Sequence, residues 1–132
     1  KMSYKLVNSV PGVGKVTTWA LLAKTNCFKR LNSPRKLACF AGVAPFNFQS
    51  GTSVHRRPAV SNRADKELKS LLHMCAISSL NSDQELITFF NRKVEQGKHK
   101  MSVVNAIRNK IIHRICAVVR DERMWQQRLV NP

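Results

Sequence analysis

The chain has 132 residues, and its 23 lysines and arginines outnumber its 7 acidic residues to give a formal net charge of +16. This length supports one domain with a hydrophobic core and excludes two large ones. A compact fold with so much positive charge repels itself, which favours a polyanionic partner, and nucleic acid is the default. Basic residues occur in every segment rather than on one amphipathic helix, so a membrane surface is the weaker interpretation. No apolar run is long enough to span a bilayer, and no signal peptide is visible.

Helical periodicity runs through nearly every segment, and no stretch alternates as a strand would. Ser33-Pro34 combines a helix cap with a proline at the first helical position, and Ser82-Asp83-Gln84-Glu85 has the pattern of a capping box. The sequence predicts a compact, all-α, multi-helix domain over residues 1–132, with a helical bundle over 62–120. The expected helices are Ser3–Asn8, Lys15–Thr25, Pro34–Ala41, Asn62–Leu80, Ser82–Gln96 and Met101–Arg120, and Arg108, Lys110 and Arg114 lie off the apolar stripe of the last one.

Polar residues do not form the pattern of a metal centre. The acidic residues are expected on helix surfaces or in helix-terminal turns, where three carboxylates do not converge as a two-metal nuclease requires. The only tyrosine, Tyr4, lies upstream of the other motifs, which disfavours a tyrosine recombinase. The cysteines have no C-x-x-C pair or close histidine, and each is expected as a reduced core thiol of a cytosolic protein. They are Cys27, Cys39, Cys75 and Cys116.

The stretch Ser9–Leu22, S-V-P-G-V-G-K-V-T-T-W-A-L-L, predicts a tight turn between two helices. Pro11 ends the first helix, and Gly12 and Gly14 permit a backbone that other residues would strain. Such a turn points N–H groups outward at a helix N-terminus, where Lys15 adds a positive charge, and this combination binds anions. Residues 4–25 resemble a helix-hairpin-helix motif, which holds a phosphate backbone without reading sequence, although Thr18 stands where that motif usually has alanine. The alternative is an ordinary helix–helix turn without a ligand.

Residues 43–61 form one long irregular loop, and a loop of this length in a compact domain is usually functional or disordered. Its apolar residues Phe46, Phe48 and Val54 favour an ordered loop. Ser50-Gly51 is a turn-forming pair, but His55 and two arginines follow it closely, and no other nucleophile is apparent. A serine attacks a phosphodiester only if its proton is removed and the developing charge is stabilised. The arginines meet the second need, and no general base is evident.

The hairpin S-V-P-G-V-G-K-V-T, the segment S-P-R-K-L-A-C-F-A-G-V-A-P and the loop Q-S-G-T-S-V follow one another, ahead of a long helix that is basic at its start. This order, from about Ser9 to Arg120, resembles the C-terminal domain of the DEDD-type insertion-sequence transposases, relatives of the Piv DNA invertase. The resemblance implies that Ser50 is a nucleophile that forms a covalent phosphoserine with a DNA strand, with Ser53 as the fallback. It also implies DNA and nucleic-acid contacts by Gly12, Gly14, Lys15, His55, Arg56, Arg57, Arg63 and Lys66.

The same resemblance implies partners that this sequence does not contain. Members carry an N-terminal RuvC-like domain whose four acidic residues bind a divalent metal such as Mg²⁺, and a structured guide RNA pairs with target and donor DNA. We therefore expect a fragment of a longer, homo-oligomeric bacterial protein of the cytoplasm and nucleoid, with no cofactor of its own and no cleavage activity alone. Two alternatives stay open: a non-catalytic helix-hairpin-helix module that binds DNA or RNA, and a basic RNA-binding domain in which Ser50 is only a turn residue.

Overall fold

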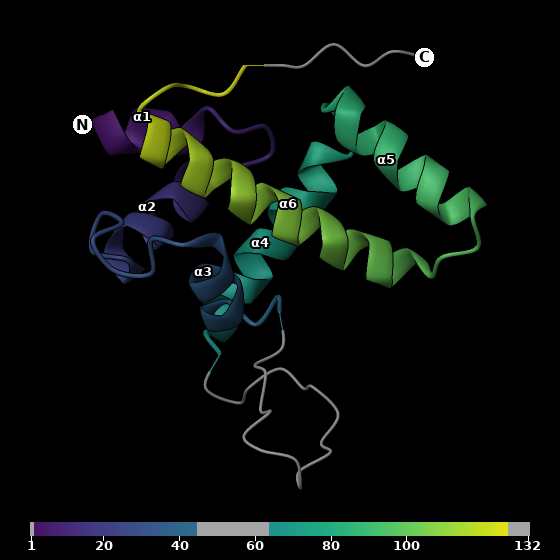
Figure 1. Ribbon diagram of the computed structural model, residues 1–132, viewed down its shortest axis with the longest axis horizontal. Coiled ribbons are helices and arrows are strands. Elements are labelled where there is room, and N and C mark those ends of the chain that lie inside the picture. Colours follow the sequence, from purple (N-terminus) through teal and green to yellow (C-terminus); the bar gives the residue numbers. More distant parts are fainter. Residues whose placement is uncertain (1, 45–63, 127–132) are drawn as a thin grey trace, which may run out of the picture.

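Helix α6 (Lys100–Asp121) runs through the middle of the molecule and contacts four of the other helices (Figure 1). The computed structural model describes residues 2–44 and 64–126. The four helices packed on α6 are α1 (Met2–Asn8), α3 (Pro34–Phe40), α4 (Lys66–Ser79) and α5 (Gln84–Glu95), while α2 (Lys15–Lys24) packs on α1 and α4. The described residues contain no strand, which confirms the all-α prediction.

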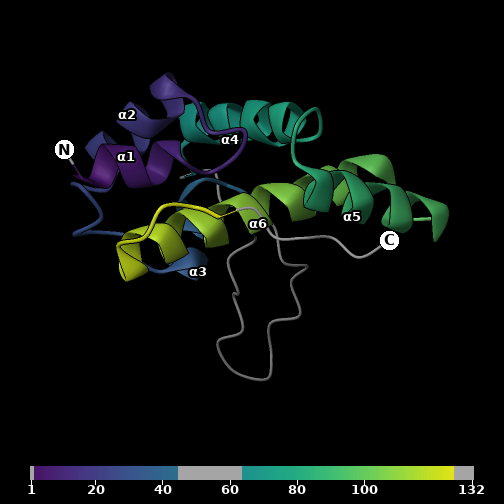
Figure 2. The same ribbon diagram turned by 90° about the horizontal axis from the view of Figure 1, so that it is seen from above.

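The hydrophobic core lies along α6. Ile107, Ile111, Ile112 and Ile115 are completely buried, because isoleucines at steps of three and four residues share one side of a helix. Figure 2 shows α2 and α4 on one side of α6 and α3 on the other. Leu68 and Leu72 of α4 and Leu37 of α3 are also completely buried and complete the core from these two sides. Among the described residues, no helix is long and apolar enough to cross a membrane.

Two helix starts differ from the prediction. α4 begins at Lys66 rather than Asn62, because the Asp65 carboxylate accepts a hydrogen bond from the Leu68 N–H (2.9 Å) and so caps the helix there. α5 is capped by Asp83 rather than Ser82, and the Asp83 side chain accepts from the Leu86 N–H at 3.1 Å. In both cases an aspartate provides the cap.

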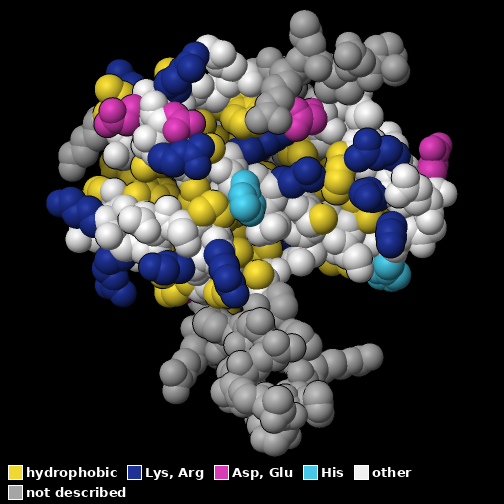
Figure 3. Space-filling view, in the orientation of Figure 1, with side chains coloured by type: hydrophobic (Ala, Val, Ile, Leu, Met, Phe, Trp, Pro, Cys, Tyr) yellow, Lys and Arg dark blue, Asp and Glu magenta, His cyan; other side chains and the backbone are white. Residues whose placement is uncertain are grey.

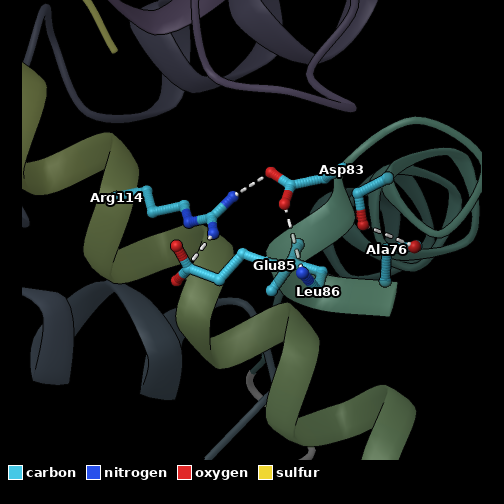
Figure 4. A network of polar contacts seen from close by, with 6 residues as sticks. Ala76, Asp83, Glu85, Leu86 and Arg114 are labelled. Atoms are coloured by element: carbon cyan, nitrogen blue, oxygen red, sulfur yellow. Dashed lines mark hydrogen bonds and ion pairs between the residues drawn. The ribbon is translucent and has the colours of Figure 1, made fainter. Parts of the chain in front are cut away.

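A buried ion pair joins the start of α5 to α6 (Figure 4). Arg114 Nη1 lies 2.6 Å from Asp83 Oδ2, and Arg114 Nη2 lies 3.2 Å from Glu85 Oε1, a charge contact rather than a well-aligned hydrogen bond. The expectation that Arg114 and Arg108 lie off the core is wrong, since both side chains are buried. Asp83 is also buried, and its charge compensates that of Arg114.

The cysteines differ in exposure. Cys75 and Cys116 are buried as expected, and burial raises the pKa of the Cys116 thiol to about 11. Cys39 is half-buried, whereas Cys27 is exposed, so the expectation of a core thiol at position 27 is wrong. After α2 the chain passes through three residues with positive φ, Asn26, Cys27 and Phe28, and this turn directs Phe28 into the core instead.

Candidate nucleic-acid interface

The turn between α1 and α2 is fixed to α4 through Gly12. Its φ of +89° is a conformation that favours glycine, and a Cβ atom there would lie 2.6 Å from the Cys75 carbonyl oxygen. Val10 and Val13 on either side are buried in the core. The turn therefore has a defined position, because both its apolar side chains and its glycine backbone are packed against the domain.

Gly14, in contrast to Gly12, has open space where a side chain would stand. It precedes α2 in an extended conformation, no side chain caps the helix, and a Cβ atom there would meet nothing within 4 Å. The first N–H groups of any helix lack partners within the helix, and at α2 they adjoin the exposed side chain of Lys15. Thr18, the departure from the motif, is buried and donates a hydrogen bond to the Gly14 carbonyl oxygen at 2.8 Å. This helix N-terminus has the geometry and charge to bind an anion.

The two glycines give a matched pair of substitutions. We expect Gly12→Ala to lower the free energy of unfolding by about 2–4 kcal/mol, because alanine is strained at positive φ and its Cβ would overlap α4. Gly14→Ala should change it by less than about 1 kcal/mol, since only a mild capping preference is lost. Urea denaturation of both variants measures the difference, and equal losses would contradict this packing.

Two hydrogen bonds bring together the described residues on either side of positions 45–63. The Asp65 N–H donates to the Phe40 carbonyl oxygen at 2.7 Å, and Asn105 Nδ2 of α6 donates to the Val43 carbonyl oxygen at 3.0 Å. These contacts join the end of α3, the start of α4 and the middle of α6. The described residues that flank positions 45–63 therefore lie next to each other in the domain. Ser50, Ser53, His55, Arg56, Arg57 and Arg63 lie outside the described residues.

Residues 4–91, two thirds of the chain, match the model of the Transposase IS116/IS110/IS902 family. The chain belongs to this family. It is 34% identical over 125 residues to the pilin gene-inverting protein of Moraxella bovis, a match that covers 94% of this chain and 39% of that protein. It is 27% identical over 124 residues to the insertion element IS110 uncharacterized 43.6 kDa protein of Streptomyces coelicolor, covering 94% of this chain and 30% of that protein. The chain thus spans about two fifths of the length of the pilin gene-inverting protein.

The N-terminal half of the chain has no acidic residue before Asp65. In the described part of the chain, Lys24 is the only basic residue before α4 that forms an ion pair. Its Nζ lies 2.7 Å from Asp65 and 3.3 Å from Glu67. Six basic residues between positions 2 and 44 have no carboxylate partner in the described structure: Lys5, Lys15, Lys29, Arg30, Arg35 and Lys36. Figure 3 shows Lys and Arg side chains spread over one face, with acidic side chains near its edges. This charge distribution suits a polyanion.

The Lys24–Asp65 pair is an acid-sensitive contact between α2 and the start of α4. Burial raises the pKa of Asp65, but hydrogen bonds from Lys24 and from the Leu68 N–H outweigh burial, and the net pKa lies below its ordinary value of 3.8. A carboxyl group whose pKa is lowered by folding stabilises the fold above its unfolded pKa. That stabilisation is lost as the pH falls through the lowered value.

We therefore expect the free energy of unfolding to decrease on acidification below about pH 4, and to decrease less in Asp65→Asn, which cannot titrate at this position. Denaturant unfolding between pH 7 and pH 3 measures both. If the wild-type chain and Asp65→Asn lost stability equally over this range, the pair would not be a source of the acid sensitivity.

Asn105, which donates to the Val43 carbonyl oxygen, could not be found from the sequence. A polar residue beside an apolar stripe is ordinary on a helix and carries no signal of such a contact. Arg108, one turn further along α6, is buried, its Nε has no hydrogen-bond partner within the described residues, and burial lowers its pKa.

Lys66, a predicted contact residue, is exposed at the start of α4. Among the described residues, no three His, Cys, Asp or Glu side chains are grouped as metal ligands.

Proposed function

We propose that this chain is the nucleic-acid-binding, C-terminal domain of a transposase or site-specific recombinase that acts in DNA transposition. The observation that carries the proposal is the uncapped N-terminus of α2, where Gly14 is open to solvent and Lys15 is exposed. Family membership and the absence of acidic residues before Asp65 support it. In this proposal residues 4–25 act as a helix-hairpin-helix that holds a phosphate backbone through the turn at Gly12 and Gly14, the Lys15 side chain and the N–H groups of the first turn of α2.

The proposal assigns the strand-cleaving nucleophile to Ser50, with Ser53 as the fallback. Support comes from the resemblance of Q-S-G-T-S-V to the serine loop of the related transposases. The Ser50 oxygen forms a bond to a DNA phosphorus while the bond from this phosphorus to the oxygen of the leaving strand breaks. The serine proton passes to a general base, and the leaving oxygen takes up a proton. His55, Arg56, Arg57, Arg63 and Lys66 would contact phosphates of DNA or guide RNA nearby.

The rest of the reaction belongs to partners of this domain. The proposal includes an N-terminal RuvC-like domain whose acidic residues hold Mg²⁺, a structured guide RNA, and homo-oligomers that act on the nucleoid in the bacterial cytoplasm. A bound Mg²⁺ would stabilise the charge that develops on the transferred phosphate. The chain alone is accordingly expected to bind DNA without cleaving it, and strand cleavage by the purified chain would contradict this division of labour.

A second candidate is a non-catalytic helix-hairpin-helix module that attaches a partner protein to DNA or RNA. The anion-binding geometry of α2 favours it equally, because this geometry needs no nucleophile. The two candidates agree on binding and differ only in the role of Ser50.

The salt dependence of duplex binding tests the hairpin. Each phosphate contact contributes roughly 0.9 to the slope of log K against log salt concentration. We expect Lys15→Ala to reduce the magnitude of the slope by roughly 0.9 and to weaken binding of different duplex sequences equally. Lys98→Ala is the matched control, because Lys98 is exposed in the turn between α5 and α6. An unchanged slope in Lys15→Ala, or an equal change in both variants, would argue against the hairpin as a backbone clamp.

A further inference from the structure

The outer face of α2 exposes apolar side chains to solvent. Val16 and Trp19 are 69% and 50% exposed, and Ala23, one turn after Trp19, is also exposed. Val16, Trp19 and Ala23 follow at steps of three and four residues, so they line one side of the helix. The opposite side of α2 carries its buried residues, Leu21 and Leu22 among them. An exposed tryptophan in the middle of such a stripe is uncommon on a surface with no partner.

Trp19 is held in place from one side. The Tyr4 ring of α1 contacts it with centroids 4.9 Å apart and an interplanar angle of 40°. Beside Trp19 lies an open hollow of about 400 Å³ whose walls include Met2, Ala23 and Asn26. The indole is therefore oriented by a neighbouring aromatic ring while half of its surface faces an accessible space.

Cations stand at both ends of this stripe. Lys15 and the open N–H groups lie at the start of α2, and the exposed Lys29 and Arg30 follow its end. α2 itself is about 15 Å long, and the Arg30 N–H donates a hydrogen bond to the Thr25 carbonyl oxygen at 2.9 Å, which keeps Arg30 beside the end of this helix. None of the three cations forms an ion pair within the residues that the structure describes. Lys24 differs, because its charge is already paired with Asp65 and Glu67 of the α4 region.

An aromatic ring between unpaired cations is the arrangement that binds unpaired nucleotides. Bases stack on the ring, and the backbone follows the positive charges. In a duplex the base faces are already stacked on one another, so a side chain such as Trp19 reaches them only in an unpaired strand. We propose that the outer face of α2 binds single-stranded nucleic acid, with one base stacked on Trp19 and the backbone running between Lys15 and Lys29–Arg30. This inference rests on the proposed function because it uses the same Lys15.

Binding to single strands tests the inference directly. Fluorescently labelled oligo-dT, oligo-U and a DNA duplex are titrated with the chain, and affinities are taken from anisotropy. We expect Trp19→Ala to weaken binding of both single strands by roughly 5- to 150-fold, since stacking of a base on an aromatic ring contributes about 1–3 kcal/mol. Trp19→Phe should retain most of the affinity, and duplex affinity should change by less than about twofold in both variants.

Tryptophan emission gives a second readout. The chain has two tryptophans, so Trp125→Phe leaves Trp19 as the sole emitter, and oligo-dT should quench its fluorescence. Val16→Ala is the matched control, because Val16 is exposed on the same side of α2 but cannot stack on a base. Circular dichroism confirms that each variant is folded.

Single-strand affinity that does not change in Trp19→Ala would overturn the inference, as would an equal loss for duplex and single strands. A loss of affinity in Trp19→Ala that is limited to oligo-dT and oligo-U supports the inference. The oligonucleotide that the unsubstituted chain binds more tightly then shows whether DNA or RNA is favoured. The hairpin clamp is judged separately by the duplex slope of Lys15→Ala. Failure of that clamp is therefore distinguishable from failure of the Trp19 site.

Discussion

Ser50→Ala in a full-length transposase that carries this sequence is expected to abolish recombination, with loss to background, while DNA affinity stays within about twofold. The hydroxyl oxygen is the atom that would bond to phosphorus, and alanine has no substitute for it. Removing one hydroxyl changes neither the charge of the protein nor residues 4–25, so the affinity for the phosphate backbone should remain. Recombination is measured on paired donor and target DNA, and affinity is measured with the same protein preparations.

Ser53→Ala is the matched control, since Ser53 is a second serine three positions further along the sequence. It should retain recombination if Ser50 is the nucleophile. If Ser53→Ala abolished recombination and Ser50→Ala did not, the nucleophile would be Ser53. Full recombination in both variants would contradict a serine nucleophile in this segment and would favour the non-catalytic binding module.

Arg114→Ala should lower the free energy of unfolding by about 3–5 kcal/mol. The guanidinium is 2.6 Å from Asp83, and it lies 4.2 Å from the centroid of the Trp125 ring. The Asp83 side chain has no exposed surface, so alanine at position 114 would leave its carboxylate buried without a counter-charge. A small domain has a total stability of about 5–15 kcal/mol, of which this loss is a large part.

Arg120→Ala gives the matched comparison on the same helix. Arg120 also pairs with an aspartate, Asp121 at 2.9 Å, but both side chains are mostly exposed. Solvent screens such pairs, and the loss should stay below about 1 kcal/mol. Urea denaturation of the two variants separates these outcomes, and similar losses would show that the Asp83–Arg114 pair does not stabilise the start of α5 against α6.

Helix existence and order could be predicted from the sequence because they depend on local signals. The periodicity of Ile107, Ile111 and Ile115 identified α6, and Ser33-Pro34 identified the start of α3. The burial of Arg114 could not be predicted in this way. Its partner Asp83 lies 31 residues earlier, and a periodicity argument assigns both charges to the surface. The exposure of Cys27 had a similar cause, since nothing in its neighbours indicated three successive residues with positive φ.

The candidate site could be predicted only in part. The sequence located the turn between α1 and α2, but it gave Gly12 and Gly14 the same role. The structure separates them, because the space around each glycine depends on α4, more than fifty residues later in the chain. Trp19 was not singled out, since its spacing in α2 also suits a core position. The assignments to Ser50, Ser53, His55, Arg56, Arg57 and Arg63 remain predictions, as these residues lie outside the described parts of the chain.

The purified chain by itself is expected to bind the phosphate backbone of nucleic acid. The most direct measurement is the affinity of the purified chain for a DNA duplex of arbitrary sequence over a range of salt concentrations. We expect log K to fall linearly with log salt, with a slope of several units at roughly 0.9 per phosphate contact and with little dependence on sequence. Binding that is undetectable at low salt, or an affinity that does not change with salt, would contradict the account.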